Sequence, residues 1–133
     1  MKHLAFVPLI GGMAIGAERA CGQPPEAVFS YEDFWGNEKY LMEWYKQRGV
    51  DVKYHLIDDP EAPTYKEVDL ITSLCPCSGL SSANPGSGSG CQQNRWMLKS
   101  TQFALKNIKP RVLVGENASR LYSNFGQPVA ATM

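Results

Sequence analysis

The sequence predicts an α/β protein with a mostly parallel sheet covered by helices on both faces. Short apolar runs alternate with segments whose apolar residues recur at helical spacing, in the order β-α-β-α-β-β-loop-α-β. Crossover helices between apolar strands are typical of parallel sheets, whose two faces are both buried. Of the 133 residues, 44% are hydrophobic and 20% are charged, which fits one globular domain.

The first three predicted elements are bounded by glycine, proline or acidic residues. Residues 3–10 form an apolar run that stops at Gly11-Gly12, so we expect a strand followed by a turn. Residues 13–22 then read as a helix, which its last glycine and the prolines after it terminate. Residues 27–33 are rich in strand-forming side chains and end in two acids.

The middle of the chain predicts one helix and two further strands. Residues 37–49 carry apolar and aromatic side chains at helical spacing and end in glycine. Residues 50–58 alternate as a strand until an acidic pair and Pro60 break it. Residues 67–75 read as a buried strand.

A loop, a helix and a strand complete the predicted order. Residues 81–93 are rich in glycine, proline and serine, a composition typical of a flexible loop. Residues 95–108 have apolar side chains at helical spacing. Residues 111–117 form an apolar strand that ends in polar residues.

Reactive and polar groups gather at the predicted strand ends. In open parallel sheets, ligands bind beyond the carboxyl ends of the strands. The ends that carry glycine, acid, thiol or amide groups are Gly11-Gly12, Glu32-Asp33, Asp58-Asp59, Cys75 to Cys77, and Glu116-Asn117. This coincidence predicts a ligand site along one edge of the sheet.

The glycines after the first strand and the acid after the second favour a nucleoside cofactor. Gly11-Gly12 lets the backbone approach a ligand, although a tight turn alone explains this pair equally well. Glu32 can accept hydrogen bonds from both hydroxyls of a ribose. Because no third glycine follows at dinucleotide-fold spacing, we expect a nucleoside without pyrophosphate, such as S-adenosylmethionine. Asp58 or Asp59 either accepts a hydrogen bond from adenine or simply starts a turn.

The cysteines are expected to be reduced and not to bind metal. Their spacings lack the C-x-x-C pairs and histidine partners of a zinc site. Strand geometry disfavours a Cys75–Cys77 disulfide, and the single proline between the two thiols disfavours a redox pair. Cys75 is expected to pack in its strand, whereas Cys77, after Pro76 and before a small-residue loop, is the better nucleophile.

Five stretches of the chain resemble motifs of the DNA cytosine-5 methyltransferase family and occur in the family's order. The glycine turn that opens this family's cofactor site is similar to VPLIGGMAIGAERA, and its next two motifs are similar to VFSYED and HLIDD. Its Pro-Cys motif resembles CPCSGLSSANPG. The region from its Asp-x-Arg signal to its Glu-Asn-Val motif resembles QNRWMLKSTQFALKNIKPRVLVGENASRL, so the resemblance covers nearly the whole chain.

The resemblance implies a Rossmann-like S-adenosylmethionine-dependent methyltransferase fold. It also implies methyl transfer to carbon 5 of a cytosine flipped out of double-stranded DNA. Cys77 would attack ring carbon 6, Glu116 would pair with ring nitrogen 3, and the loop over residues 78–92 would close over the base. The implied catalytic residues are Cys77, Glu116, Asn117 and Arg95, and the implied cofactor-binding residues are Ile10, Gly11, Gly12, Glu32, Asp33, Asp58 and Pro76.

Several positions depart from the family pattern, and the later motifs are absent. The departures are Val7 for an aromatic residue, Leu9 for glycine, Ser78 for glutamine, Leu80 for phenylalanine, Gln93 for aspartate and Ala118 for valine. We therefore expect a partial catalytic domain over residues 1–133 without a target-recognition domain: a truncated protein, a fragment, a subunit of a split enzyme or a degenerate copy. Its expected parts are a cofactor-binding half (1–60), a nucleophile strand and loop (67–94), and a helix with the Glu-Asn strand (95–118).

Two other functions stay open. The Pro-Cys-Ser-Gly stretch also resembles RNA cytosine-5 methyltransferases, but those take their nucleophile from a later Thr-Cys motif, and no cysteine follows Cys91. The fold can also serve as a non-catalytic module that binds cofactor, DNA or a partner protein, such as a second subunit. Acidic and basic residues number 13 each, which does not predict a globally basic nucleic-acid binder.

The sequence also predicts where the protein works. No stretch approaches the roughly 18 apolar residues of a membrane span, and no export signal is expected. We expect a cytoplasmic protein of a bacterial or phage-infected cell, for which restriction-modification, phage self-protection and epigenetic marking are equally compatible roles.

Overall fold

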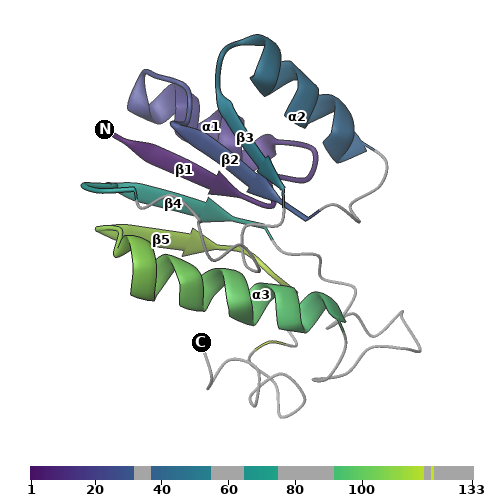
Figure 1. The fold of residues 1–133 in the computed structure, drawn as a ribbon, viewed down its shortest axis with the longest axis vertical. Helices are drawn as coiled ribbons and strands as arrows, with labels where there is room; N and C mark the ends of the chain where they lie inside the picture. The colour runs from purple at the N-terminus through teal and green to yellow at the C-terminus, as the bar shows by residue number, and fades with distance from the viewer. Residues whose placement is uncertain (32–36, 55–64, 75–91, 119–120, 122–133) are drawn as a thin grey trace.

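The computed structural model describes residues 1–31, 37–54, 65–74, 92–118 and 121, and the other segments are the thin grey trace of Figure 1. In the described part, the elements follow the predicted order. They are β1 (His3–Phe6), α1 (Gly12–Cys21), β2 (Ala27–Ser30), α2 (Asn37–Gln47), β3 (Asp51–Tyr54), β4 (Leu70–Ser73), α3 (Gln92–Phe103), η2 (Ala104–Ile108) and β5 (Val112–Gly115).

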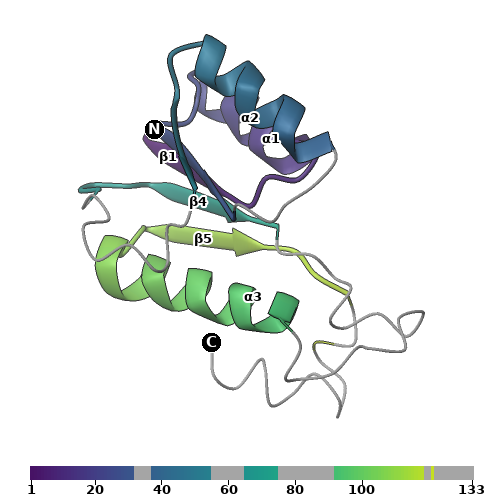
Figure 2. The same cartoon turned by 45° about the vertical axis from the view of Figure 1, so that its right-hand side comes forward.

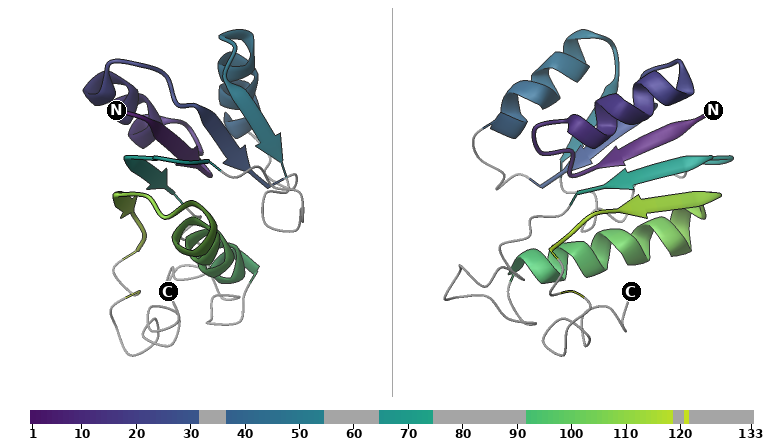
Figure 3. Two further views of the ribbon diagram at one scale, coloured as in Figure 1. Left: turned by 60° about the vertical axis from the view of Figure 1, so that its left-hand side comes forward. Right: turned by 180° about the vertical axis from the view of Figure 1, so that it is seen from behind.

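The strands form one parallel sheet with the order β3-β2-β1-β4-β5. The helices lie on both of its faces: α1 and α2 cover one face and α3 lies on the other, as Figures 2 and 3 show. The predicted α/β class with a parallel sheet is therefore confirmed. The chain order reverses at β1, which has β2 on one side and β4 on the other, and such a reversal marks the ligand crevice of open α/β sheets.

Successive side chains of β1 point to opposite faces of the sheet, so that β1 contributes to a hydrophobic core on each face. Leu4 and Phe6 pack with Ile108 on the face that α3 and η2 cover. Ala5, which lies between them in the strand, packs instead with Leu41 on the face that α1 and α2 cover. Successive side chains of a strand point to opposite faces, so a small residue at Ala5 lets the two helices approach the sheet closely.

The boundaries of several elements differ from the prediction by a few residues, and two of the differences are accompanied by a change in backbone conformation. β1 ends at Phe6, before the expected residue 10, because Val7 and Leu9 have φ angles of 48° and 52°, which take the chain out of the extended conformation. The last helix begins at Gln92 and finishes in the π-helical turn η2, which Lys109 closes with φ 55°.

The end of α1 is the predicted one. Gly22 caps the helix in the left-handed conformation, with φ 72°, and its N–H donates to the carbonyl of Glu18. Gly49, after α2, also has a positive φ of 80°. Within the described residues, no helix has the length and apolar character needed to cross a bilayer.

Candidate active site

The ends of β1, β4 and β5 lie in one row across the sheet. Phe6 pairs with Ser73, and Ser73 pairs with Gly115. Beyond this row, the N–H of Leu74 donates to the carbonyl of Phe6 at 3.2 Å, and the N–H of Glu116 donates to the carbonyl of Ser73 at 3.3 Å. The segments that start at Val7, Leu74 and Glu116 therefore leave the sheet at the same edge, which we call the carboxyl edge.

The turn between β1 and α1, residues 7–11, lies at the carboxyl edge and contains Gly11. Gly11 has φ 94°, accepts the first helical hydrogen bond from Ile15 at 2.8 Å and donates to the carbonyl of Pro8 at 2.8 Å. Glycine is needed at this position because few other residues adopt this positive φ, and also because a Cβ there would lie 2.8 Å from Cδ1 of Leu41. A Cβ at Gly12 would meet no atom of the described residues within 4 Å, so these residues leave the first turn of α1 uncovered.

Ile10 lies at the tip of this turn and is 74% exposed. A large aliphatic side chain next to a helix start that no described side chain caps suits a ligand with both polar and apolar parts. The described residues of the turn therefore fit the expected contact with a nucleoside cofactor.

Two residues of the turn hold left-handed conformations that are unfavourable for their side chains. Val7 is β-branched and has φ 48°, and Leu9 has φ 52°; such residues each cost about 1–3 kcal/mol and persist where surrounding contacts hold them. The N–H of Val7 donates to the carbonyl of Phe29 at 2.6 Å. The N–H of Leu9 donates to Oε1 of Glu38 at 3.2 Å.

Glu38, in the first turn of α2, is a buried acid that sequence reasoning missed. Only 3% of it is exposed, and its Oε2 accepts a hydrogen bond from the hydroxyl of Ser30 at 2.6 Å. Burial raises the pKa of Glu38, while the hydrogen bonds from Ser30 and from the N–H of Leu9 partly oppose that rise. An acid in the first turn of an amphipathic helix ordinarily faces water, so the sequence contains no signal for this contact.

A cluster of apolar and aromatic side chains underlies the carboxyl edge. This edge cluster joins the ends of β1 and β2 to α3 and the segment after β5. Tyr31 stacks on Trp96, with ring centroids 4.7 Å apart at 19°, and its hydroxyl donates to the carbonyl of Trp96 at 2.9 Å. The edge cluster consists of Val7, Tyr31 and Met97, with Leu9, Trp96, Leu98, Ala118 and Leu121 packed against them.

Asn117 is fixed against this edge cluster. Its Nδ2 donates to the sulfur of Met97 at 3.1 Å, and its Oδ1 accepts from the N–H of Ala118 at 2.8 Å. These contacts hold the backbone directly after Glu116, whose own side chain is exposed at the carboxyl edge. An exposed carboxyl group on a fixed backbone is free to contact a substrate.

The structure brings some of the predicted site residues together at this edge. Ile10, Gly11, Gly12, Glu116 and Asn117 belong to the segments that follow β1 and β5. Arg95 is exposed near the start of α3, the end of that helix that meets the same edge in Figure 1. The other predicted site residues, Glu32, Asp33, Asp58, Pro76 and Cys77, lie outside the described residues, as do Cys75 and Asp59.

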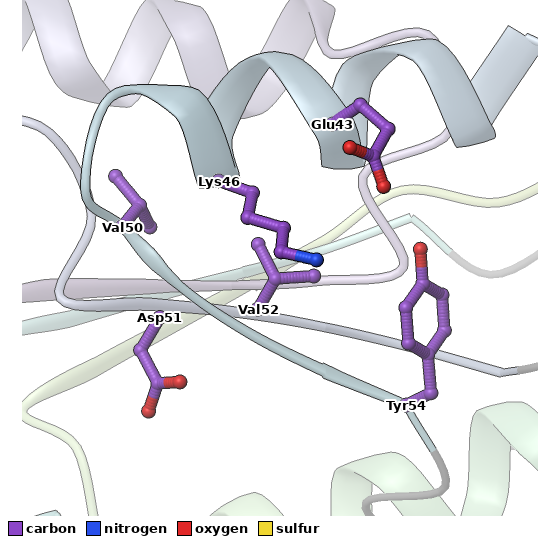
Figure 4. A pocket seen from close by; sticks show the side chains of 6 residues that line it. All are labelled: Glu43, Lys46, Val50, Asp51, Val52 and Tyr54. Carbon is purple, nitrogen blue, oxygen red and sulfur yellow. The ribbon is translucent and has the colours of Figure 1, made fainter.

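A shallow pocket of about 310 Å³ lies apart from these residues, between α2 and β3 (Figure 4). Glu43 and Tyr54 point toward one another across it, and Lys46, Val50, Asp51 and Val52 complete its lining. Burial, and then the negative charge of Glu43, raise the pKa of Tyr54. None of the predicted site residues that the structure describes lines this pocket. No group of three or more potential metal ligands occurs among the described residues either.

The strand order and the glycine turn at the carboxyl edge define a Rossmann-like domain with its ligand edge beside β1 and β4. The sequence matches the family model of the C-5 cytosine-specific DNA methylases over residues 1–131. The chain therefore belongs to this family, and the fold is that of a cytosine-5 DNA methyltransferase domain. No curated protein matches the chain significantly in sequence.

Proposed function

We propose that the chain transfers a methyl group from S-adenosylmethionine to carbon 5 of a cytosine flipped out of double-stranded DNA. The observation that carries this proposal is the common row of strand ends, Phe6, Ser73 and Gly115. Because the three following segments start side by side, the glycine turn, the Pro-Cys stretch and Glu116 can act on one reaction centre.

On the cofactor side, S-adenosylmethionine supplies an electrophilic methyl group on a sulfonium sulfur. We expect the open backbone at Gly11 and Gly12, together with Ile10 and Pro76, to contact it. Glu32 would accept hydrogen bonds from the ribose hydroxyls, and Asp33 and Asp58 would contact the adenine.

On the base side, the thiolate of Cys77 adds to ring carbon 6 of cytosine. The carboxyl group of Glu116 donates a proton to ring nitrogen 3, which offsets the charge that the addition places on the base. Carbon 5 would then accept the methyl group, and the bond between that group and the sulfur of the cofactor would break as the new bond forms. Loss of the proton from carbon 5 to water would expel the Cys77 thiolate, and ring nitrogen 3 would return its proton to Glu116. Asn117 holds the segment of Glu116, and Arg95 is expected to assist base or DNA binding.

The proposal is tested by trapping on double-stranded DNA that contains 5-fluorocytosine, in which the last step is blocked. The unaltered chain with S-adenosylmethionine should give a covalent protein–DNA adduct, and Cys77→Ser should give none. Cys21→Ser is the matched control, because Cys21 is a free thiol on α1. An adduct that persists in Cys77→Ser, or is lost in Cys21→Ser, contradicts the assignment of the nucleophile.

A second function, a non-catalytic module that binds cofactor, DNA or a partner protein, is favoured by one observation. Leu9 stands where the family resemblance has glycine, and it holds an unfavourable φ of 52°. Calorimetry separates the two functions. Binding of S-adenosylmethionine without adduct formation supports the module, whereas both together support the enzyme.

A further inference from the structure

A buried carboxylate joins the glycine turn to the second strand. Glu38 accepts hydrogen bonds from two segments that are distant in the sequence: the N–H of Leu9, in the turn, and the hydroxyl of Ser30, the last residue of β2. Among the described residues, no lysine or arginine forms a salt bridge with Glu38. Burying a carboxyl group is costly unless its oxygens are hydrogen-bonded, and both oxygens of Glu38 accept a hydrogen bond.

The hydrogen bond to Glu38 matters because Leu9 has an unfavourable backbone conformation. A leucine has no intrinsic preference for φ 52°, and glycine would adopt this conformation without support. The side chain of Leu9 packs against the edge cluster, which also contains Met97, the partner of Asn117. Leu9 therefore connects the turn to the Glu116 segment, a contact that glycine lacks, but its backbone requires an external acceptor for its N–H.

We propose that Glu38 is a positioning residue that holds Leu9 in the left-handed conformation and thereby sets the glycine turn for the cofactor. One carboxyl oxygen of Glu38 accepts from the turn and the other accepts from Ser30 of β2. Glu38 therefore fixes the position of the turn relative to the sheet. Gly11 follows Leu9 by two residues and is bonded back to Pro8, so a displacement of Leu9 moves Gly11 as well. The role in cofactor binding rests on the proposed function, whereas the role in holding the turn does not.

The first experiment measures the turn without any cofactor. Hydrogen exchange of the Leu9 amide, followed by NMR, should become roughly tenfold faster in Glu38→Ala, because the amide loses a charged acceptor. Glu43→Ala, an exposed acid of the same helix, is the matched control and should leave the Leu9 amide unchanged. A folded Glu38→Ala chain with unaltered exchange at Leu9 overturns the proposal.

If Glu38→Ala does not fold, Glu38→Gln takes its place. Its amide oxygen can still accept from Leu9, but as a neutral and weaker acceptor, so exchange should rise by a smaller factor. Exchange at Leu9 that is the same in Glu38→Gln and the unaltered chain overturns the proposal in that case.

The second experiment measures the dissociation constant of S-adenosylmethionine by calorimetry. Glu38→Ala should weaken binding roughly tenfold, and adding Leu9→Gly should restore part of the loss, because glycine needs no external acceptor. If the loss of affinity in the double variant equals the sum of the losses in Glu38→Ala and Leu9→Gly, in free energy, then Glu38 acts on general stability. That result contradicts a positioning role. If the unaltered chain binds no S-adenosylmethionine, the proposed function fails, and the exchange experiment alone decides whether Glu38 holds the turn.

Discussion

The side-chain amide of Asn117 donates a hydrogen bond to the thioether sulfur of Met97 at 3.1 Å. This contact fixes the segment after β5 to α3, so the position of Glu116 depends on a methionine that lies 20 residues earlier in the chain. Met97 is 5% exposed, and its sulfur is the acceptor on which the orientation of the amide depends.

Met97→Leu should lower the free energy of unfolding by up to about 1 kcal/mol beyond the effect of the changed side-chain shape, because the half-buried amide of Asn117 loses its acceptor. Urea unfolding measures this. Met42→Leu is the control, because Met42 is a buried methionine of α2 that packs in the core on the other face of the sheet. Equal losses in the two variants would show that the sulfur contact contributes nothing.

Alanine at the two glycines of the turn should separate stability from binding. Gly11→Ala should lower the free energy of unfolding by about 1–3 kcal/mol, because φ is 94° and the new Cβ would press on Leu41. Gly12→Ala should leave stability unchanged or slightly higher, since no atom of the described residues lies within 4 Å of the new methyl group. Thermal unfolding measures both.

Gly12→Ala should nevertheless weaken binding of S-adenosylmethionine roughly tenfold, equivalent to about 1.4 kcal/mol. The added methyl group would occupy the surface that the proposed cofactor approaches. Calorimetry on the two glycine variants gives the comparison. Full affinity in Gly12→Ala would place the cofactor elsewhere.

Glu38 should make stability fall as the pH rises. Its pKa in the folded chain is raised above the ordinary value of 4.5, so the folded state holds the proton more tightly than the unfolded state does. As the pH rises from 4.5 through the raised value, the buried carboxyl group ionises and the folded state loses stability. Glu38→Gln cannot ionise, so its stability relative to the unaltered chain should improve over this window. Denaturant unfolding at a series of pH values measures this difference in the free energy of unfolding. A difference that does not change with pH would contradict the burial of the Glu38 carboxyl group.

Glu18 should show the opposite sign. Its hydrogen bond with Arg48 lowers the pKa of Glu18, and the two side chains form a salt bridge between the ends of α1 and α2. The stabilisation is therefore present above pH 4.5 and is lost as the pH falls through the lowered value. Compared with Glu18→Gln, the unaltered chain should lose its advantage in acid. It should also lose it in high salt, because the pair is partly exposed.

The order of the elements could be predicted because its signals are local. Apolar runs, helical spacing and glycines such as Gly22 mark each element without reference to the rest of the chain. The early end of β1 could not be predicted in this way. The positive φ of Val7 and Leu9 depends on acceptors supplied by Phe29 and Glu38, which only the folded sheet brings near.

The candidate site was predictable to a similar extent. The sequence places Gly11 and Glu116 after strands, and the parallel register explains why two distant segments share one edge. The contact between Asn117 and Met97 and the burial of Glu38 depend on how helices pack on that edge, for which the sequence has no local signal. Glu32, Asp33, Asp58, Pro76 and Cys77 stay predictions.

The ring stack of Tyr31 on Trp96 gives the protein an optical reporter at the carboxyl edge. Indole emission responds to changes in the surroundings of the ring, and Trp96 lies in the edge cluster that the turn and the Glu116 segment share. Trp44 lies on α2 with the guanidinium of Arg48 4.1 Å from its ring centroid, outside the edge cluster. Emission that Trp96→Phe removes and Trp44→Phe retains would therefore follow occupancy of the edge in real time, without a label and without turnover.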